Sequence, residues 1–282
     1  MRLAALCFGA IFTPVLNSIL QIFRKAQAPV QLPAVPEGER YYVVGDVHGR
    51  LDLFDALRRG IEDDDSASPQ ASSTVVLLGD LVDRGPDSAG VIAAAREWQS
   101  LRPLRCLAGN HEEMFLDSFE DKDVLRHFLK HGGRETIMSY GISRKDLDAL
   151  GLGELQDELA RLIPEGDRAF LQALEEMIVA GDYVFVHAGV DPSRAMDDQS
   201  RNDLLWIRER FLRHADPLSH VVVHGHTIFE NIEDRGHRIG IDTGAFRTGV
   251  LTALVLDGTT QRYIQAVDID GTITIRHTGG IT

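Results

Sequence analysis

Five segments of the chain share one hydrophobic pattern, a short run of mostly apolar and often β-branched residues that stops abruptly at a turn. These runs lie at residues 40–44, 74–78, 103–107, 182–186 and 219–223. Runs of this length and composition predict strands that are buried on both faces, as in a parallel sheet. Apolar residues at helical spacing predict helices at 51–61 and 88–98. Strands that alternate with helices predict an α/β fold with a mostly parallel sheet.

The pattern changes in three later or intervening parts of the chain. The acidic run at 62–65 predicts a solvated loop after the first helix. Residues 113–180 carry apolar residues at helical spacing and predict a helical insertion that borders the strand ends and selects substrates. Alternating or apolar segments at 238–242, 249–256 and 261–267 predict antiparallel strands that complete a second sheet.

The first 38 residues differ from the rest. Residues 3–23 are largely apolar, and three prolines between 28 and 36 predict an extended linker. The apolar segment fits a signal peptide, a membrane anchor or a docked helix, although Pro14 interrupts it. We therefore divide the chain into an N-terminal segment with linker, 1–38, and a catalytic domain, 39–282. If the protein associates with a membrane, we expect residues 3–23 to make the contact.

Polar side chains follow each of the five predicted strands. They form the motifs GDVHG at 45–49, GDLVDRG at 79–85, GNHE at 109–112, HAG at 187–189 and GHT at 225–227. The carboxyl ends of parallel strands meet at one edge of a sheet, so these side chains are expected to gather there. Carboxylate, amide and imidazole donors suit hard or borderline divalent cations. One such strand end is an ordinary polar loop, but five in order predict a metal site.

In this order, the motifs resemble those of the calcineurin-like metallophosphoesterases. GDLVDRG with GNHE is similar to the phosphoprotein phosphatase branch, the serine/threonine protein phosphatases, and especially to its bacterial and phage members. The resemblance covers Tyr41 to about Leu256. It implies an αββα sandwich of two mixed β-sheets flanked by helices, with two divalent metal ions, Mn²⁺ in first place and Fe or Zn as alternatives.

The resemblance also implies roles for individual residues. One metal ion would be held by Asp46, His48 and Asp80, and the other by Asp80, Asn110, His187 and His226. A metal-bridging hydroxide would attack the phosphorus atom of a phosphomonoester. His111 would protonate the leaving group with Asp83 fixing its tautomer, while Arg84, Arg208 and Asn110 would bind the phosphate.

Two departures from related motifs bear on the substrate. Related nucleases and diesterases carry GHxH, but here the second histidine position is Ile228, as in the phosphatase branch, which predicts a more open first metal site. Bacterial dinucleoside tetraphosphate hydrolases usually carry GDLVARG, so Asp83 favours the phosphatase. The alternatives are a dinucleoside polyphosphate or other nucleotide hydrolase, and a metal-binding scaffold without turnover.

Composition narrows the partners. The formal charge of −14 argues against a nucleic-acid partner, since binding to nucleic acid relies on neutralising phosphates. The expected partner is a phosphorylated protein or a small phosphoester. With only two cysteines the chain has no disulfide framework, which suits a cytoplasmic location.

Overall fold

The computed structural model describes residues 32–279. The predicted apolar segment at 3–23 lies outside the described residues. Within 32–279, no helix is both long and apolar enough to cross a membrane.

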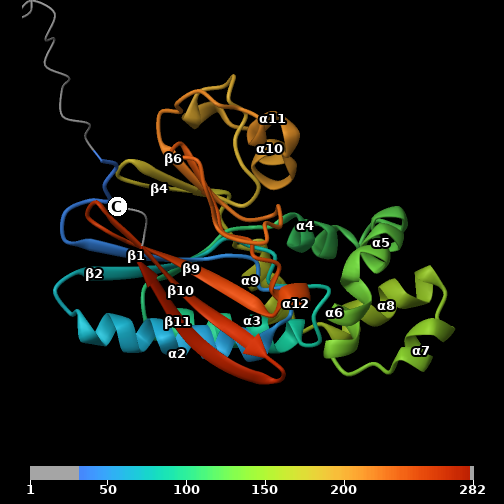
Figure 1. Ribbon diagram of the computed structural model, residues 1–282. Helices are drawn as coiled ribbons and strands as arrows, with labels where there is room; N and C mark the ends of the chain where they lie inside the picture. Colours follow the sequence, from blue (N-terminus) through green and yellow to red (C-terminus); the bar gives the residue numbers. More distant parts are fainter. Residues whose placement is uncertain (1–31, 280–282) are drawn as a thin grey trace, which may run out of the picture. The chain divides into compact units, whose positions relative to one another are not determined.

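The first sheet combines parallel and antiparallel strands in the order β11-β10-β9-β1-β2-β3 (Figure 1). Its strands are β1 (Glu39–Val44), β2 (Ser72–Leu77), β3 (Leu104–Cys106), β9 (Val250–Asp257), β10 (Thr260–Ile269) and β11 (Thr272–Gly279). Strands β1, β2 and β3 are parallel neighbours, whereas β9 pairs antiparallel with β1. The prediction of a parallel sheet is confirmed for the first three strands.

The second sheet has the order β4-β5-β6-β8-β7. Its strands are β4 (Met177–Ala180), β5 (Tyr183–Val186), β6 (Val221–His224), β7 (Glu233–Asp234) and β8 (Arg238–Gly240). Strands β5, β6 and β8 are parallel, and an antiparallel strand lies at each edge.

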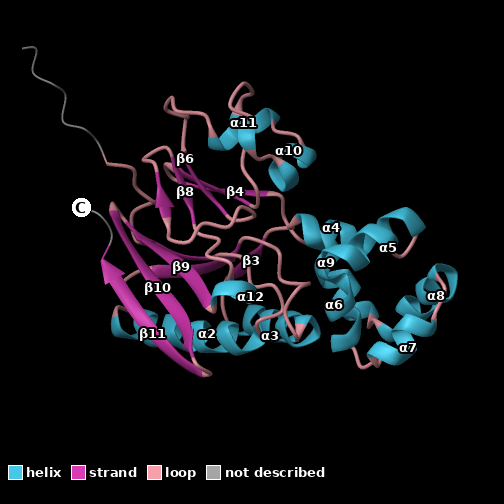
Figure 2. Ribbon diagram, turned by 45° about the vertical axis from the view of Figure 1, so that its right-hand side comes forward, coloured by secondary structure: helices cyan, strands magenta, loops and turns pink. Residues whose placement is uncertain are grey.

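The two sheets face each other, with helices on both outer faces (Figure 2). In β1, Val43 packs into the core between the sheets, whereas Tyr42 and Val44 pack toward α2 (Leu51–Ala67) and α3 (Ser88–Leu101). This alternation follows from the two-residue period of a strand. On the far face, the second sheet packs against α10 (Arg201–Trp206) and α11 (Glu209–Leu212). The predicted αββα sandwich is confirmed.

The insertion forms a helical unit with its own core (Figure 1). Its elements are α4 (Asn110–Asp117), α5 (Lys122–Phe128), η1 (Leu129–Gly133), α6 (Arg134–Ser139), α7 (Arg144–Ala149), α8 (Leu152–Leu162) and α9 (Glu165–Gln172). Two short elements elsewhere are η2 (Met196–Asp198) and α12 (Ala245–Thr248). The predicted insertion ends too late, because residues 177–180 form strand β4.

Two further predictions were wrong. The acidic run at 62–65 is not a solvated loop but part of α2, where Asp64 accepts hydrogen bonds from Tyr42 and Arg262, and Asp65 pairs with Arg40. These partners reduce the repulsion between the carboxylates that gather near the end of α2. The segments at 249–256 and 261–267 do not complete the second sheet; they form β9 and β10 of the first sheet, and only residues 238–240 of the three segments join the second.

Candidate metal centre and acid pair

The loops that follow β1, β2, β3, β5 and β6 meet at the carboxyl ends of these strands. Their backbones adopt an uncommon conformation: within the described residues, six non-glycine positions have positive φ, and five of them belong to these loops. The five are His48, Asp80, Asp83, Arg84 and His226. Left-handed backbone in residues other than glycine is costly and is found where the surrounding structure holds it in place, often at functional sites.

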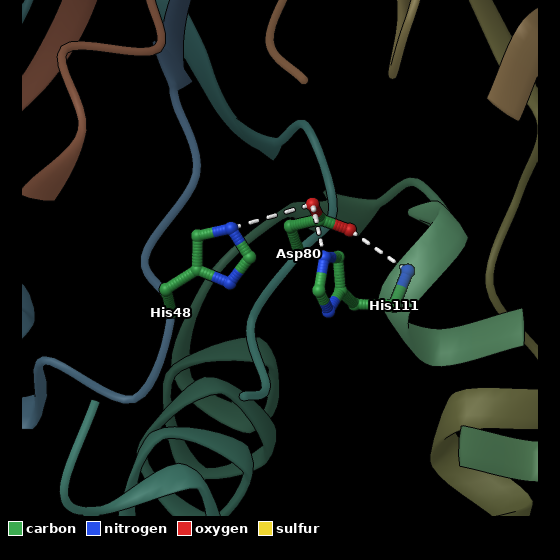
Figure 3. Close-up of side chains that lie close together, drawn as sticks. All are labelled: His48, Asp80 and His111. Carbon is green, nitrogen blue, oxygen red and sulfur yellow. Dashed lines mark hydrogen bonds and ion pairs between the residues drawn. The ribbon is translucent and has the colours of Figure 1, made fainter. Parts of the chain in front are cut away.

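Asp80 lies at the centre of the site, between two histidines (Figure 3). Its Oδ2 is 3.4 Å from Nε2 of His48 and 3.9 Å from Nε2 of His111. The backbone N–H of His111 donates to Oδ1 at 3.1 Å. Burial alone would raise the pKa of Asp80, but the charges of the surrounding histidines when protonated, His187 first, lower the pKa below its usual range. Asp80 is therefore an anion facing several nitrogen donors.

A second cluster lies on the other oxygen of Asp80. His187 places Nε2 3.4 Å from Asp80 Oδ1 and 3.1 Å from Asn110 Oδ1. The same amide oxygen is 2.7 Å from Nδ1 of His226. The backbone N–H of His226 in turn donates to Oδ2 of Asp46 at 2.9 Å. All six residues predicted as metal ligands are thus joined by one continuous series of contacts.

The histidine tautomers can be assigned from carbonyl contacts. Nδ1 of His48 lies 2.7 Å from the carbonyl oxygen of Val82, and Nδ1 of His187 lies 2.8 Å from that of Leu78. A carbonyl can only accept, so both Nδ1 atoms carry the proton and both Nε2 atoms present a lone pair to Asp80. Burial lowers the pKa of both histidines, and that of His226 to about 2. Neutral imidazole is the form that binds metal ions.

Asp46 stands apart from the other carboxylate and histidine ligands that the sequence predicts. It belongs to neither group of three ligand atoms that lie within 4.8 Å of one another, which are His48 with Asp80 and His111, and Asp80 with His187 and His226. Its Oδ1 is buried without a hydrogen-bond partner among the described residues. Burial raises the pKa of Asp46, and the negative charge of Asp242 adds to this effect.

This donor set fits two divalent cations that share Asp80. It offers carboxylate, amide and neutral imidazole donors, and the Nδ1 protons of His48 and His187 are directed away onto carbonyl groups. Hydrogen bonds of this kind fix the ring orientation and are typical of metal-binding histidines. Oδ1 of Asp46, buried without a hydrogen-bond partner among the described residues, is a further oxygen free to bind an ion.

His111 forms a pair with Asp83, and a residue of the helical insertion holds this pair in place. Nδ1 of His111 is 2.5 Å from Oδ2 of Asp83, and Thr136 in α6 donates to the other oxygen at 2.6 Å. The backbone N–H of Asp83 donates to Thr136 Oγ1 and to Ser88 Oγ. Burial lowers the pKa of His111, but Asp80 and Asp83 outweigh it and raise the pKa above its usual value.

The two predicted phosphate-binding arginines both contact histidines of the site. Arg84 donates to Nε2 of His48 and of His111, at 2.7 Å each. Arg208 is exposed and donates from Nε to Nε2 of His226 at 2.9 Å. Both guanidinium groups therefore lie beside the metal cluster, where they add positive charge.

Sequence reasoning missed two buried residues that hold the site. Thr136 has no local signal, because it reaches Asp83 across 53 positions of the chain. Glu112 belongs to the GNHE motif, and its carboxylate accepts the backbone N–H groups of Asp80, Leu81 and Gly109. The available signal for Glu112 was a buried acid in a metal-site motif, but two of these three partners, Asp80 and Leu81, lie on another loop.

The αββα sandwich thus gathers candidate metal ligands at one edge, with Asp80 between two clusters of histidine and amide donors. Comparison with known proteins agrees: the family described as calcineurin-like phosphoesterase matches residues 39–245. This chain belongs to the calcineurin-like phosphoesterases, a family that depends on two metal ions, and it is a phosphoester hydrolase.

Individual relatives differ in their named substrates. The chain is 30% identical over 217 residues to serine/threonine-protein phosphatase 1 of Salmonella typhimurium, covering 75% of this chain and 89% of the relative. It is 32% identical over 157 residues to a symmetrical bis(5'-nucleosyl)-tetraphosphatase of Paracidovorax citrulli, covering 55% of this chain and 46% of the relative. Among solved structures, a candidate diadenosine tetraphosphatase has a TM-score of 0.55 at 21% identity, over 88% of this chain and 99% of that one.

Proposed function

We propose that residues 39–282 form a cytoplasmic, Mn²⁺-dependent phosphatase that hydrolyses phosphoserine and phosphothreonine in proteins. The observation that carries this proposal is the His111–Asp83 pair beside the shared aspartate, with Nδ1 and Oδ2 2.5 Å apart. A serine alkoxide is a strongly basic leaving group and needs a proton, whereas the phosphate leaving group of a dinucleoside polyphosphate is stable as an anion. An acid held in this way supports an alkyl phosphomonoester as substrate.

The roles of the side chains follow from their positions. When bound, two divalent cations supply an activated water nucleophile and neutralise charge on the phosphoryl oxygens. Arg84 and Arg208 bind the non-bridging oxygens with their guanidinium groups, and the Asn110 amide adds a further contact. Once the phosphate draws Arg84 away from His111, Nε2 of that ring carries the proton and delivers it to the leaving oxygen, while Asp83 holds the ring and stabilises its charged form.

A pocket of about 290 Å³ is lined by the second turn of α4, by α5 and by Trp206, two residues before Arg208. Two of its acidic residues, Glu113 and Asp123, are paired with Arg201 and Arg126, so the pocket is not a strongly anionic surface. It offers a largely apolar surface for the segment that flanks a phosphorylated residue.

The test compares a phosphoserine peptide, p-nitrophenyl phosphate and diadenosine tetraphosphate with Mn²⁺ added. His111→Gln should retain metal yet lose about 10²–10⁴-fold in rate on the phosphoserine peptide, with a smaller loss on the other two substrates, whose leaving groups need less help. His131→Gln is the control, since His131 is exposed and its ring contacts the backbone carbonyl of His127.

The outcomes separate the candidate functions. Equal losses on all three substrates would mean that His111 supports position and not proton transfer. A wild-type preference for diadenosine tetraphosphate by orders of magnitude would replace the phosphatase with the nucleotide hydrolase. Absence of turnover on every substrate, with both metal sites filled, would contradict catalysis altogether.

A further inference from the structure

Asp242 is a buried acid beside the metal cluster that the proposed mechanism does not use. It follows strand β8, and its side chain is 1% exposed. Oδ1 accepts the backbone N–H of Gly244 at 2.8 Å. Oδ2 is buried with no hydrogen-bond partner among the described residues. A buried carboxylate oxygen without a partner is costly, so its position calls for an explanation.

Asp46, in the loop that follows β1, is in the same condition. It is 2% exposed, and its Oδ1 also lacks a partner within the described residues. The backbones that carry the two acids touch: a Cβ on Gly45 would lie 2.6 Å from the carbonyl oxygen of Ile241 and 3.6 Å from the backbone nitrogen of Asp242. This close approach brings the carboxyl groups of Asp46 and Asp242 into direct interaction.

No side-chain cation of the described residues neutralises this pair. The charge of Arg84 lowers the pKa of both acids, but its hydrogen bonds go to the histidines His48 and His111. Asp80 adds a third negative charge close by. Three carboxylates shielded from water repel one another strongly, and a divalent cation between them would remove the repulsion.

We propose that Asp242 is a further ligand of the first metal ion, which its Oδ2 and the Oδ1 of Asp46 hold together. The neighbouring contacts agree with this assignment. Ile228, which stands where related diesterases carry their second histidine, packs over Gly244: a Cβ on Gly244 would lie 2.9 Å from Ile228 Cγ2. Asp242 thus supplies a donor on the side of the site from which that histidine is missing. The first metal site is less open than the sequence predicts.

The experiment titrates the metal-free full-length protein with Mn²⁺ alone and follows heat and stoichiometry. Asp242→Asn should weaken one of the two sites by at least about tenfold and leave the other unchanged, because it removes a charged donor from one ion only. The same substitution should raise the melting temperature of the metal-free protein, since it relieves repulsion, and lower that of the Mn²⁺-loaded protein. A side chain with a merely structural role would lower both.

Asp234→Asn is a matched control. Asp234 also accepts the N–H of a glycine two residues ahead, Gly236, at 2.8 Å, but it is exposed on β7 and belongs to none of the five motifs. It therefore tests the loss of an Asp–Gly turn without loss of a metal donor. Its Mn²⁺ affinities should equal those of the wild type.

The inference rests on the two-metal site of the proposed function, and the results separate the two. If the wild type binds no Mn²⁺ at either site, both the proposed function and the role of Asp242 are refuted. If the wild type binds two ions and Asp242→Asn binds both with wild-type affinity, only the role of Asp242 is refuted, and the two acids share a proton instead.

Discussion

Glu112 holds the loop that carries the shared aspartate, and its replacement by glutamine gives a sharp test of the site's architecture. The side chain is fully buried. Oε2 accepts the backbone N–H groups of Asp80 and Gly109, both at 2.8 Å. Oε1 accepts those of Leu81 at 2.7 Å and Val82 at 3.2 Å. Four donors converge on one carboxylate, which therefore ties the loop after β2 to the start of α4.

The magnitude follows from counting donors. In Glu112→Gln the side-chain amide would have one acceptor oxygen, so one pair of N–H groups would face its NH₂ group and lose its bonds. A hydrogen bond to a charged group contributes about 1.5–3 kcal/mol, so two lost bonds cost about 3–6 kcal/mol. Burial, followed by the charge of Asp80, raises the pKa of Glu112 to about 7, which offsets part of this stabilisation. We expect the lower end, about 3 kcal/mol, or roughly 6–12 °C in melting temperature for a domain of this size.

The assay is urea and thermal unfolding of Glu112→Gln in its metal-free form, followed by Mn²⁺ titration. Metal-free protein is used first because bound ions would add their own stabilisation. Glu120→Gln, a change at an exposed position of the same insertion, is the control and should unfold like the wild type. An unfolding free energy for Glu112→Gln within about 0.5 kcal/mol of the wild type would refute the reasoning, since that is the range of ordinary surface substitutions.

Three other predictions test the rest of the site. Exhaustive chelation should abolish phosphatase activity and Mn²⁺ should restore it better than Ca²⁺, as rate measurements with metal analysis would show, because mixed nitrogen and oxygen donors suit a transition ion. Arg84→Ala and Arg208→Ala should each weaken inhibition by inorganic phosphate while leaving metal content intact; an unchanged inhibition constant would remove that arginine from the site. Thr136→Val deletes the hydroxyl that donates to Asp83 at 2.6 Å and should lower the rate on a phosphoserine peptide more than on p-nitrophenyl phosphate. Equal effects on both substrates would contradict a link from Thr136 to the acid.

That the candidate metal ligands gather at one place was predictable, because each of them follows a buried strand within a short motif. Asp46 with His48, and Asn110 with His111, are close in sequence, so each motif can be recognised by itself. The fold then brings the strand ends that carry these motifs to one edge of the sheet. The sheet membership of residues 249–256 was not predictable in this way, because an apolar strand carries no information on its neighbour. That neighbour is β1, reached by antiparallel pairing between segments far apart in the chain.

The supporting residues were harder to predict for the same physical reason. Asp242 follows a strand, and the sequence shows it as an acid near a turn. Its position beside Asp46, however, depends on the close approach of Gly45 to Ile241, which the sequence does not show. Thr136 lies in a helix whose hydrophobic pattern indicates only which face is buried. The insertion was expected to border the site, and the contacts of Thr136 with Asp83 and of the Gly132 carbonyl with the Arg84 N–H place it against the acid pair.

The left-handed residues explain why the site needs this support. Five non-glycine residues with positive φ stand within a few loops, and each costs about 1 kcal/mol or more relative to ordinary backbone. The sum, about 5 kcal/mol, is as large as the net stability of many domains. Such a cost persists only where other contacts over-determine the loops, and Glu112 holds the backbone at Asp80 while Thr136 and Ser88 hold it at Asp83. The buried polar contacts of Glu112, Thr136 and Ser88 therefore offset the backbone cost of the loops that carry the candidate metal ligands.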